Sequence, residues 1–520
     1  MMLGTVEALC IALPLLLGSL YWYLTMTFDY WKKAGIHYKE PTIIFGNIKD
    51  RLLFRKSFHE TQRDVYMSFK GHKFAGHFEG RRPLLLVRDP ELIKHIMVRD
   101  FQHFVDRLTL GIRSSPYIDN MLPNMSGQHW KNIRALLTPT FSSGKLKAME
   151  NLVQQCGQRM ETFLEIETDG TYVELEMKKF FERFMLDSIA TCAFGIECNS
   201  LKDPDDEFLK MASRFNDIKI LNRIFILFVV LLMPQLTRFL RLSFINKQVT
   251  EFLVNVVKKT IEYRRTHKEQ KRNDFLQLMI DAAEEEKEGC DEKQENSATN
   301  NSRKTSTTVL NEETIIAQAL LFLLAGFETS STLLTYTSYE LALNQDIQQK
   351  LRKEIEEVLE KHGGRCSHEA LMEMNYLEMV LLESLRKHPP AARVDRICTQ
   401  PYTIPGTNIN LKKGCAVTIS IMGLHHDPEH FPQPEVYDPD RFLPTQTLTR
   451  SPYVFLPFGA GPRNCIGMRF ALMSTKTAMV HLIKNFQLMP SPKTEIPYKF
   501  SKSSLILKAQ NGIWLKIQKL

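Results

Sequence analysis

The chain is poor in cysteine, and its cysteines are scattered. Nine occur among 520 residues, an odd number, and none forms a C-x-x-C pair. This pattern argues against a disulfide framework and against a cysteine-ligated zinc site. Because free thiols persist in a reducing compartment, the sequence predicts that the bulk of the chain faces the cytosol.

The sequence also lacks a strong charge of either sign. Its 67 Lys and Arg residues against 59 Asp and Glu residues give a formal net charge of +8. It has no zinc-finger spacing, no basic region followed by heptads and no dense stripe of Lys and Arg, which argues against nucleic acid as a partner. The mild positive excess suits an anionic membrane surface or an acidic protein partner. The composition, 43% hydrophobic and 24% charged, is that of a globular protein with a sizeable core.

No charged side chain occurs from Ala8 to Phe28, a run of 21 residues. As an α-helix this run would be about 31 Å long, which matches the hydrocarbon thickness of a bilayer. Aromatic residues occupy 21–23, and Lys32 is the first basic residue, an arrangement that favours an anchor with the following chain in the cytosol. We therefore expect a single-pass membrane anchor at residues 1–30 and a cytosolic domain at residues 31–520. A cleaved signal peptide is the alternative, although a basic start and a small-residue cleavage site are missing.

Two further stretches stand out by composition. Residues Ile224–Met233 form an apolar run that is too short to span a bilayer, so it is either a buried helix or a segment in contact with a membrane surface. Residues 284–308 are charged, rich in Ser, Asn and Thr, and nearly without apolar side chains. That composition predicts an exposed, flexible linker.

Local signals predict several elements before the middle of the chain. Residues 73–78 and 83–87 flank a turn at 79–82 and predict a β-hairpin. Pro90 precedes a helical apolar period and predicts the start of a helix. Residues Phe101–Asn124 are aromatic, mixed and turn-rich, so we expect a long loop with a functional role.

A glycine- and proline-rich turn near the C-terminus presents one cysteine. The stretch Phe458-Gly459-Ala460-Gly461-Pro462-Arg463-Asn464-Cys465-Ile466-Gly467 is followed at once by an apolar run of helical period. Backbone N–H groups can approach the sulfur of a cysteine in such a turn, which suits a stabilised thiolate.

Residues 311–344 predict a long, largely buried helix that has a glycine in its middle. Asn311 can cap its N-terminus, and the first turn carries two glutamates, which the helix dipole favours. Gly326 costs about 1 kcal/mol relative to alanine inside a helix, so its presence calls for a reason. Close approach of a flat ligand to the backbone is one such reason. Glu328 and Thr329 follow in the next turn, where they could handle protons.

Two residue pairs share a helix face by their spacing. Trp130 and Arg134 lie at i, i+4, where the indole N–H and the guanidinium can reach one acceptor. Glu383 and Arg386 lie at i, i+3. Taken alone, either spacing is as compatible with a packed tryptophan or an exposed ion pair as with a functional site.

Read together, these motifs resemble those of the cytochrome P450 haem-thiolate monooxygenases. All six fixed positions of the family's haem-ligand pattern, Phe-Gly-x-Gly-x-Arg-x-Cys-x-Gly, are present around Cys465. Ala325–Thr329 is similar to the family's oxygen-activation motif, and Glu383-x-x-Arg386 with Arg441 to its buried ion-pair network. Asp440 stands where the family often has Glu. The resemblance implies a mainly α fold with small β-sheets, a triangular helical prism around a buried haem, and Cys465 as the axial thiolate ligand of the iron.

The resemblance also implies roles for further residues. Thr329 and Glu328 would manage protons, and a network of Glu383, Arg386 and Arg441 would be structural. Arg396 is the expected propionate ligand from its segment, with Arg393 as the competitor. The expected haem contacts are Cys465, Trp130, Arg134, Arg396, Arg463, Phe458, Ala325 and Gly326. The expected substrate-pocket residues are Phe104, Leu108, Ile118, Phe215, Phe322, Ala391, Val394 and Leu505, and Ala325 would border the pocket as well.

Residues Gly467–Met473 look like the microsomal branch that contains drug-oxidising and insect detoxification enzymes, and the linker and the Ile224–Met233 run look more insect-like. This branch implies haem b as cofactor and hydroxylation or epoxidation of a xenobiotic or other lipophilic small molecule. It implies O2 as co-substrate and NADPH-derived electrons from a diflavin reductase or a cytochrome b5-type donor. A basic surface that includes Lys131 and Lys145 would dock the reductase, and the enzyme would sit in the endoplasmic reticulum membrane.

Two other functions remain open at this stage. One is a haem-thiolate isomerase or dehydratase that rearranges peroxides without a reductase, although an intact Thr329 and Glu328 count against it. The other is a haem-based sensor that does not turn over. Consumption of NADPH in the presence of reductase and dioxygen distinguishes the three.

Overall fold

The computed structural model describes residues 2–109, 115–196, 198–203, 206–215, 218, 220–233, 235–240, 242–243, 245–267, 269, 272, 274–295 and 310–520. Over these residues the chain is mainly helical with small β-sheets, as predicted. The helices of ten residues or more are α1 (Met2–Thr25), α4 (Phe58–Met67), α7 (Gly127–Leu137), α8 (Ser143–Glu167), α9 (Met177–Ile189), α11 (Ile220–Leu232), α12 (Lys247–Thr266), α13 (Phe275–Glu295), α14 (Glu312–Leu343), α15 (Gln345–Lys361), α17 (Asn375–Lys387) and α20 (Met468–Ile483).

Shorter helical segments connect these elements. The short α-helices are α2 (Tyr30–Lys33), α3 (Lys49–Leu52), α5 (Pro90–Lys94), α6 (Pro116–Asp119), α10 (Glu207–Ser213), α16 (His368–Glu373), α18 (Ile421–His425) and α19 (Pro444–Thr447). Two segments are π-helical, η1 (His95–Arg99) and η4 (Ala190–Phe194). The 3₁₀ segments are η2 (Phe101–His103), η3 (Thr138–Phe141), η5 (Leu236–Arg238), η6 (Pro439–Phe442), η7 (Pro452–Val454) and η8 (Gly461–Arg463).

The strands form three sheets. Their order is β1-β2-β7-β4 in the largest, β3-β9-β8 in the second and β5-β6 in the third. The strands are β1 (Phe74–Glu79), β2 (Arg82–Val87), β3 (Tyr172–Glu176), β4 (Arg393–Ile397), β5 (Tyr402–Thr403), β6 (Asn410–Leu411), β7 (Ala416–Ser420), β8 (Phe486–Pro490) and β9 (Trp514–Lys519).

The predicted hairpin is confirmed by the antiparallel pairing of β1 with β2, which places Phe74 opposite Val87. Gly80 turns the chain with a positive φ of 59°, a conformation that glycine adopts without steric cost. The helix predicted at Pro90 is α5, and Asp89 caps it by accepting a hydrogen bond from the N–H of Glu91.

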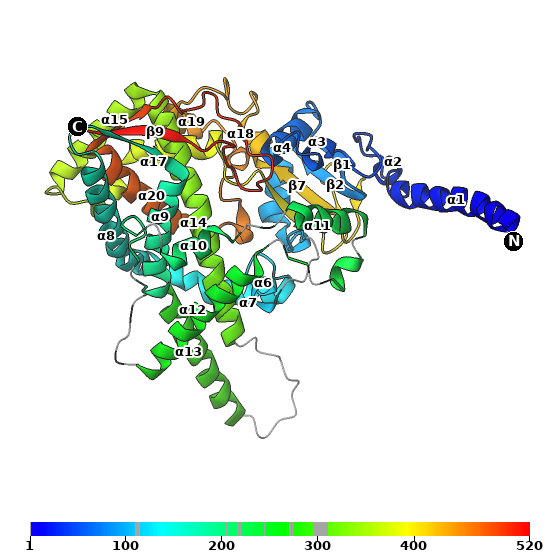
Figure 1. Ribbon diagram of the computed structural model, residues 1–520, viewed down its shortest axis with the longest axis horizontal. Helices are drawn as coiled ribbons and strands as arrows, with labels where there is room; N and C mark the ends of the chain where they lie inside the picture. Colours follow the sequence, from blue (N-terminus) through cyan, green and yellow to red (C-terminus); the bar gives the residue numbers. More distant parts are fainter. Residues whose placement is uncertain are drawn as a thin grey trace.

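Helix α14 runs through the centre of the helical part of the molecule (Figure 1). The side chain of Asn311 caps it by accepting from the N–H of Thr314 at 2.8 Å, as its sequence predicts. The helix packs against α9, α12, α17 and α20, which explains why it is apolar on nearly all sides. Among the described residues α14 is the helix long and apolar enough to cross a membrane, yet 61% of its apolar window is buried in the protein. It is therefore a core helix.

Helix α1 projects from the body on the side of the β1–β2 sheet (Figure 1). From Cys10 onward its side chains are mostly exposed and apolar, among them Leu16 and Trp22. At its base the hydroxyl of Tyr23 donates to the main-chain oxygen of Leu232 at 2.7 Å. Helix α1 thus meets the end of α11.

Helix α11 is buried on one face only. Ile226 and Val229 are buried in the protein, whereas Leu221, Phe225 and Phe228 are exposed. The apolar run Ile224–Met233 is therefore neither wholly core nor wholly surface, because its helix is buried on one side and bare on the other.

Two sequence predictions need correction. Residues 284–295 of the predicted linker are helical, because α13 continues to Glu295; Glu and Lys are good helix formers, which the composition argument ignored. Residues 296–308 of that prediction lie outside the described residues. Within the described residues of the segment 101–124, which are 101–109 and 115–124, the chain is irregular in part as expected, but it contains the short helical segments η2 and α6.

Candidate active site

A cavity of about 570 Å³ lies where α14, α7, β4 and the Cys465 loop meet. Leu122 and Pro123 border it from the loop that precedes α7, and Val394 borders it from β4. Phe322 and Leu333 border it from α14. Most of its wall is apolar, which favours an apolar occupant.

The Cys465 loop turns sharply because of its glycines. Gly459 and Gly461 have φ angles of 70° and 69°, values that side chains other than glycine rarely adopt. A Cβ on Gly461 would overlap the carbonyl oxygen of Met97 in η1. The N–H of Cys465 donates to the oxygen of Phe458 at 2.9 Å and closes the loop before α20 begins at Met468. The loop is therefore shaped by its own turn and by η1 behind it.

The thiol of Cys465 is exposed to the cavity that it lines. Burial within the protein raises its pKa, whereas the N–H of Gly467 and the guanidinium groups of Arg107 and Arg134 act in the opposite direction. The predicted approach of a backbone N–H to the sulfur is thus present. A cation on the cavity side would lower the pKa further, because thiolates are stabilised by positive charge.

Five arginines border the cavity: Arg107, Arg134, Arg393, Arg396 and Arg463. Arg396 is 1% exposed, and burial together with the charges of Arg107 and Arg463 lowers its pKa to about 9. The buried Nε atoms of Arg396 and Arg107 have no hydrogen-bond partner among the described residues. Such a cluster calls for an anionic ligand, and carboxylates suit guanidinium groups best.

Arg463 is already engaged with main-chain oxygens. Its Nε donates to the oxygen of Val105 at 2.8 Å, and its two terminal nitrogens donate to Pro123 and Met125. Its guanidinium also lies 4.3 Å from the ring centroid of Trp130. These contacts hold the loop before α7; Arg463 also borders the cavity, and its contact with a propionate stays a prediction.

Arg134 and Trp130 both border the cavity, as their spacing on α7 allows. Arg134 donates to the main-chain oxygen of Asn464 at 3.1 Å and to its side-chain oxygen at 2.9 Å. This pair fixes α7 to the residue before Cys465.

The competitor Arg393 also borders the cavity, but its guanidinium is already paired with carboxylates. It forms an ion pair with Glu79 and a second with Asp395 at 3.1 Å, and these carboxylates raise its pKa. Arg396, which has a free buried Nε in the described part of the chain, is the better candidate for a ligand carboxylate.

Arg107 was missed by the sequence reasoning. It borders the cavity, donates to the main-chain oxygen of Arg463 at 3.0 Å, and is close enough to Cys465 to affect its pKa. It lies in the irregular segment 101–124, where neither helical nor strand periodicity indicates which side chains point inward. A buried position for an arginine in such a loop has no local sequence signal.

The glycine in the middle of α14 is Gly326, which borders the cavity, as expected, and lies close to α9. A Cβ at this position would also stand 2.7 Å from Cδ1 of Ile189 in α9, so any larger residue would displace the end of that side chain. Ala325 and Phe458 border the cavity as well.

The hydroxyl of Thr329 borders the cavity and donates to the main-chain oxygen of Ala325 at 2.7 Å. Glu328 does not border the cavity. Its main-chain oxygen accepts from the buried Nζ of Lys178 at 2.7 Å, and the same ammonium donates to the hydroxyls of Ser331 and Thr332. Lys178, from α9, is a second residue that the sequence reasoning missed.

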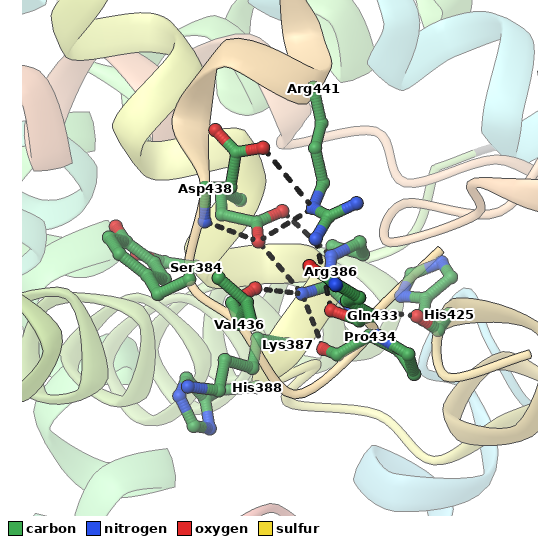
Figure 2. A network of polar contacts seen from close by, with 12 residues as sticks. Ser384, Arg386, Lys387, His388, His425, Gln433, Pro434, Val436, Asp438 and Arg441 are labelled. Carbon is green, nitrogen blue, oxygen red and sulfur yellow. Dashed lines mark hydrogen bonds and ion pairs between the residues drawn. The ribbon is translucent and has the colours of Figure 1, made fainter. Parts of the chain in front are cut away.

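Glu383, Arg386 and Arg441 lie together in the structure. Arg386 donates from Nε to Glu383 at 2.7 Å, and both side chains are fully buried. Arg441 lies 3.6 Å from the same carboxylate. Figure 2 shows Arg386 also directed at the main-chain oxygens of His425 and Pro434, which it reaches at 2.9 and 2.8 Å.

Half of the expected pocket residues border the cavity, namely Leu108, Phe322, Ala391 and Val394. The other four, in the part of the chain that the structure describes, do not. Phe104 is fully buried against Tyr402, with ring centroids 4.9 Å apart. Ile118 and Phe215 pack in the helical core, and Leu505 is 60% exposed. The cavity wall instead includes Ile189, Cys192 and Ala193 from α9 and η4, for which the sequence carried no signal.

Comparison with known proteins places the chain among close relatives. A family model described as Cytochrome P450 matches residues 37–516. The chain is 37% identical over 516 residues to Cytochrome P450 6k1 of Blattella germanica, covering 98% of each protein. It is 38% identical over 513 residues to Cytochrome P450 9e2 of the same organism, covering 95% of this chain and 94% of that protein. It is 35% identical over 516 residues to Cytochrome P450 6A1 of Musca domestica, covering 98% of this chain and 97% of that protein.

Proposed function

The chain belongs to the cytochrome P450 family and is a haem monooxygenase, and from this premise we propose that it hydroxylates or epoxidises lipophilic small molecules, xenobiotics among them, in the cavity beside Cys465. The observation that supports this reading is the apolar cavity with a cysteine sulfur at one side and Thr329 of α14 in its wall. The insect relatives agree with the predicted branch.

The residues present fit haem b. Cys465 offers a thiolate for the iron, and the unpartnered Nε atoms of Arg396 and Arg107 offer donors for two propionates. Trp130 and Arg134 would add donors from α7, and Ala325 and Gly326 leave room for a flat ring beside α14. When bound, the haem supplies the redox chemistry that activates dioxygen.

The protein's own groups would control protons and water around that chemistry. We assign Thr329 to hold and pass a proton at Oγ1, because its hydroxyl borders the cavity. Glu328, one residue earlier and outside the cavity wall, would exchange protons with solvent. The apolar wall would orient the substrate and keep bulk water out.

The buried ion-pair network would hold the core behind the haem in place. Removal of any of its three members would leave a charge without its partner in a buried site, which is costly. Its proposed role is structural, because no member borders the cavity.

The enzyme is proposed to be bound to a membrane. The exposed apolar side chains of α1 and the bare face of α11, including Leu221 and Phe225, support this reading, and Tyr23 joins the two helices. Residues 1–30 would be the anchor in the endoplasmic reticulum membrane, with residues 31–520 facing the cytosol.

Electrons would arrive from NADPH through a diflavin reductase, with a cytochrome b5-type donor as an additional source. Lys131 on α7 is exposed and Lys145 on α8 is half-buried. Lys131 directly follows Trp130 on α7, and Lys145 lies in the first turn of α8. Because Trp130 and Cys465 border the same cavity, a reductase docked on these lysines would be near Cys465. If the rate of turnover does not depend on ionic strength, the proposal that the reductase docks on these lysines is wrong.

The proposed function is tested by NADPH consumption and product formation. Purified protein, a diflavin reductase, dioxygen and a panel of lipophilic compounds should consume NADPH and yield products that contain one added oxygen atom. Rearrangement of a lipid peroxide without NADPH would instead identify an isomerase, and haem binding without any turnover would identify a sensor.

A further inference from the structure

A glutamine of α14 bonds the loop that forms one wall of the cavity. Gln318 is 0% exposed. Its Nε2 donates to the main-chain oxygen of Asn120 at 2.6 Å, and its Oε1 accepts from the N–H of Leu122 at 3.0 Å. One carboxamide therefore satisfies a main-chain acceptor and a main-chain donor that are two residues apart.

Gln318 does not itself border the cavity, but the residues next to its contacts do. Leu122, Pro123 and Asn124 form part of the cavity wall. Gln318 lies seven residues before Ala325, which is about two helical turns and therefore the same face of α14. Phe322, between the two, also borders the cavity.

The wall segment is bonded at its other end as well. Arg463, two residues before Cys465, donates to the main-chain oxygens of Pro123 and Met125. The side chain of Asn124 also donates to the main-chain oxygen of Ile118 in α6 at 2.8 Å. Residues 120–125 are thus held to α14 on one side and to the Cys465 loop on the other.

We propose that Gln318 is a positioning residue that holds wall segment 120–125 against α14 and thereby sets the affinity and the release rate of ligands in the cavity. Breaking a hydrogen bond between buried groups leaves both without water or protein partners, so the segment would separate from the helix to recover solvent. This inference needs only that ligands occupy the cavity. It does not depend on the membrane, the reductase or the proton roles.

The chemistry of the carboxamide suggests two informative variants. In Gln318→Leu neither hydrogen bond can form. In Gln318→Glu a protonated carboxyl can still donate to Asn120 and accept from Leu122, whereas the ionised form can only accept. The second variant should therefore resemble the native protein at low pH and the leucine variant at high pH.

The chain offers a matched control in Gln348 of α15. This glutamine is also buried, donates to the main-chain oxygen of Leu488 at 3.0 Å and accepts from the N–H of the same residue at 2.9 Å. It clamps strand β8 in the same manner, and it does not border the cavity. Its Nε2 also donates to the main-chain oxygen of Leu341 at 2.9 Å, and its Oε1 also accepts from Arg352 at 3.1 Å. Gln348→Leu therefore removes more buried hydrogen bonds than Gln318→Leu does, at a site that should not affect ligands.

The experiment uses the haem-loaded full chain and 4-phenylimidazole as the cavity probe. Hydrogen exchange of residues 120–125 is measured by mass spectrometry, and dissociation of the probe is followed by the change in the haem spectrum. Gln318→Leu should raise both the exchange rate and the dissociation rate about tenfold, the size expected for losing buried hydrogen bonds. Gln348→Leu should raise exchange in β8 alone.

Three results would overturn the proposal. One is native exchange of residues 120–125 in Gln318→Leu, and another is faster exchange there with unchanged affinity and release of the probe. The third is a Gln348→Leu variant that loses the probe as readily as Gln318→Leu. If Gln318→Leu does not fold, Gln318→Glu decides: its probe dissociation rate, relative to the native protein at each pH, should rise from pH 6 to pH 9, and a constant ratio refutes the proposal.

Discussion

The ammonium group of Lys178 donates to the main-chain oxygen of Glu328 at 2.7 Å. A side chain from α9 is therefore bonded to the turn of α14 that ends at Thr329. The same carbonyl also accepts from the hydroxyl of Thr332 at 2.8 Å, so two side chains converge on this oxygen within the helix. Lys178 is buried, and burial lowers the pKa of its ammonium group.

Replacement of Lys178 by Met should impair control of protons at Thr329. The variant leaves the oxygen of Glu328 and two hydroxyls without their ammonium donor, so the turn would shift. We expect peroxide released per NADPH to rise several-fold, in the same direction as in Thr329→Ala, while Cys465 still ligates haem. Lys179→Met, at an exposed neighbouring position, is the control. Peroxide release equal to that of the control would remove Lys178 from the proton path.

Replacement of Cys465 by Ala should abolish the thiolate spectrum of the ferrous–CO complex. Cys465 is the cysteine that lies in the family's haem-ligand pattern and is exposed to the cavity near the arginine cluster. Cys398→Ala is the control, because Cys398 is a buried thiol outside the cavity wall. The assignment is wrong if the spectrum persists in the first variant or disappears in the second.

Replacement of Glu383 by Gln should cost stability and haem. Arg386 and Arg441 would lose their shared carboxylate in a buried site, a loss of about 3–5 kcal/mol in the free energy of unfolding. Denaturant unfolding and the haem content of purified protein measure both effects. Asp440→Asn serves as control, since the pair of Asp440 with Lys350 at 3.0 Å is exposed and should contribute less than about 1 kcal/mol. Equal losses in the two variants would contradict the role of burial.

Acid should destabilise the protein through His59. Burial lowers the pKa of this histidine from 6.5 to about 4, and its Nε2 donates to the main-chain oxygens of Pro389 and Pro390. Between these pH values the unfolded chain binds a proton that the folded protein rejects, so stability falls as pH falls below 6.5. Each pH unit inside that window costs about 1.4 kcal/mol, or about 2 kcal/mol between pH 7 and pH 5.

The variant His59→Gln tests this sign. Glutamine keeps a donor for the carbonyls but does not titrate. The free energy of unfolding from denaturant curves should fall less between pH 7 and pH 5 in the variant, by about the amount assigned to His59. Parallel pH dependence in the two proteins would show that His59 does not contribute.

Features that depend on neighbouring residues in the chain could be predicted from the sequence. The cap at Asn311, the hairpin around Gly80 and the turn before Cys465 are set by local geometry, and each is present in the structure. The linker prediction failed within residues 284–295 because low apolar content excludes a packed core but does not exclude a helix.

The cavity wall could be predicted only in part. Phe322 and Val394 lie on regular elements close to the motifs at Ala325–Thr329 and Arg393–Arg396, and both border the cavity. Phe104 and Leu505 lie in irregular segments, where the direction of a side chain depends on distant partners such as Tyr402. Three polar residues, Arg107, Lys178 and Gln318, belong to no sequence motif. Their hydrogen-bond partners are distant in the chain, so only the folded structure identifies them.

Gly461 packs directly against the carbonyl oxygen of Met97, so the effect of substitutions near Met97 should reach the Cys465 loop. The backbone that carries the sulfur rests on η1, more than 350 residues earlier in the chain. Because hydrogen bonding and exposure around a thiolate ligand tune the reduction potential of haem, a change at residues 95–99 would alter how readily the enzyme accepts its first electron. Natural differences in turnover between relatives with identical cysteine loops should therefore be sought in that π-helical turn.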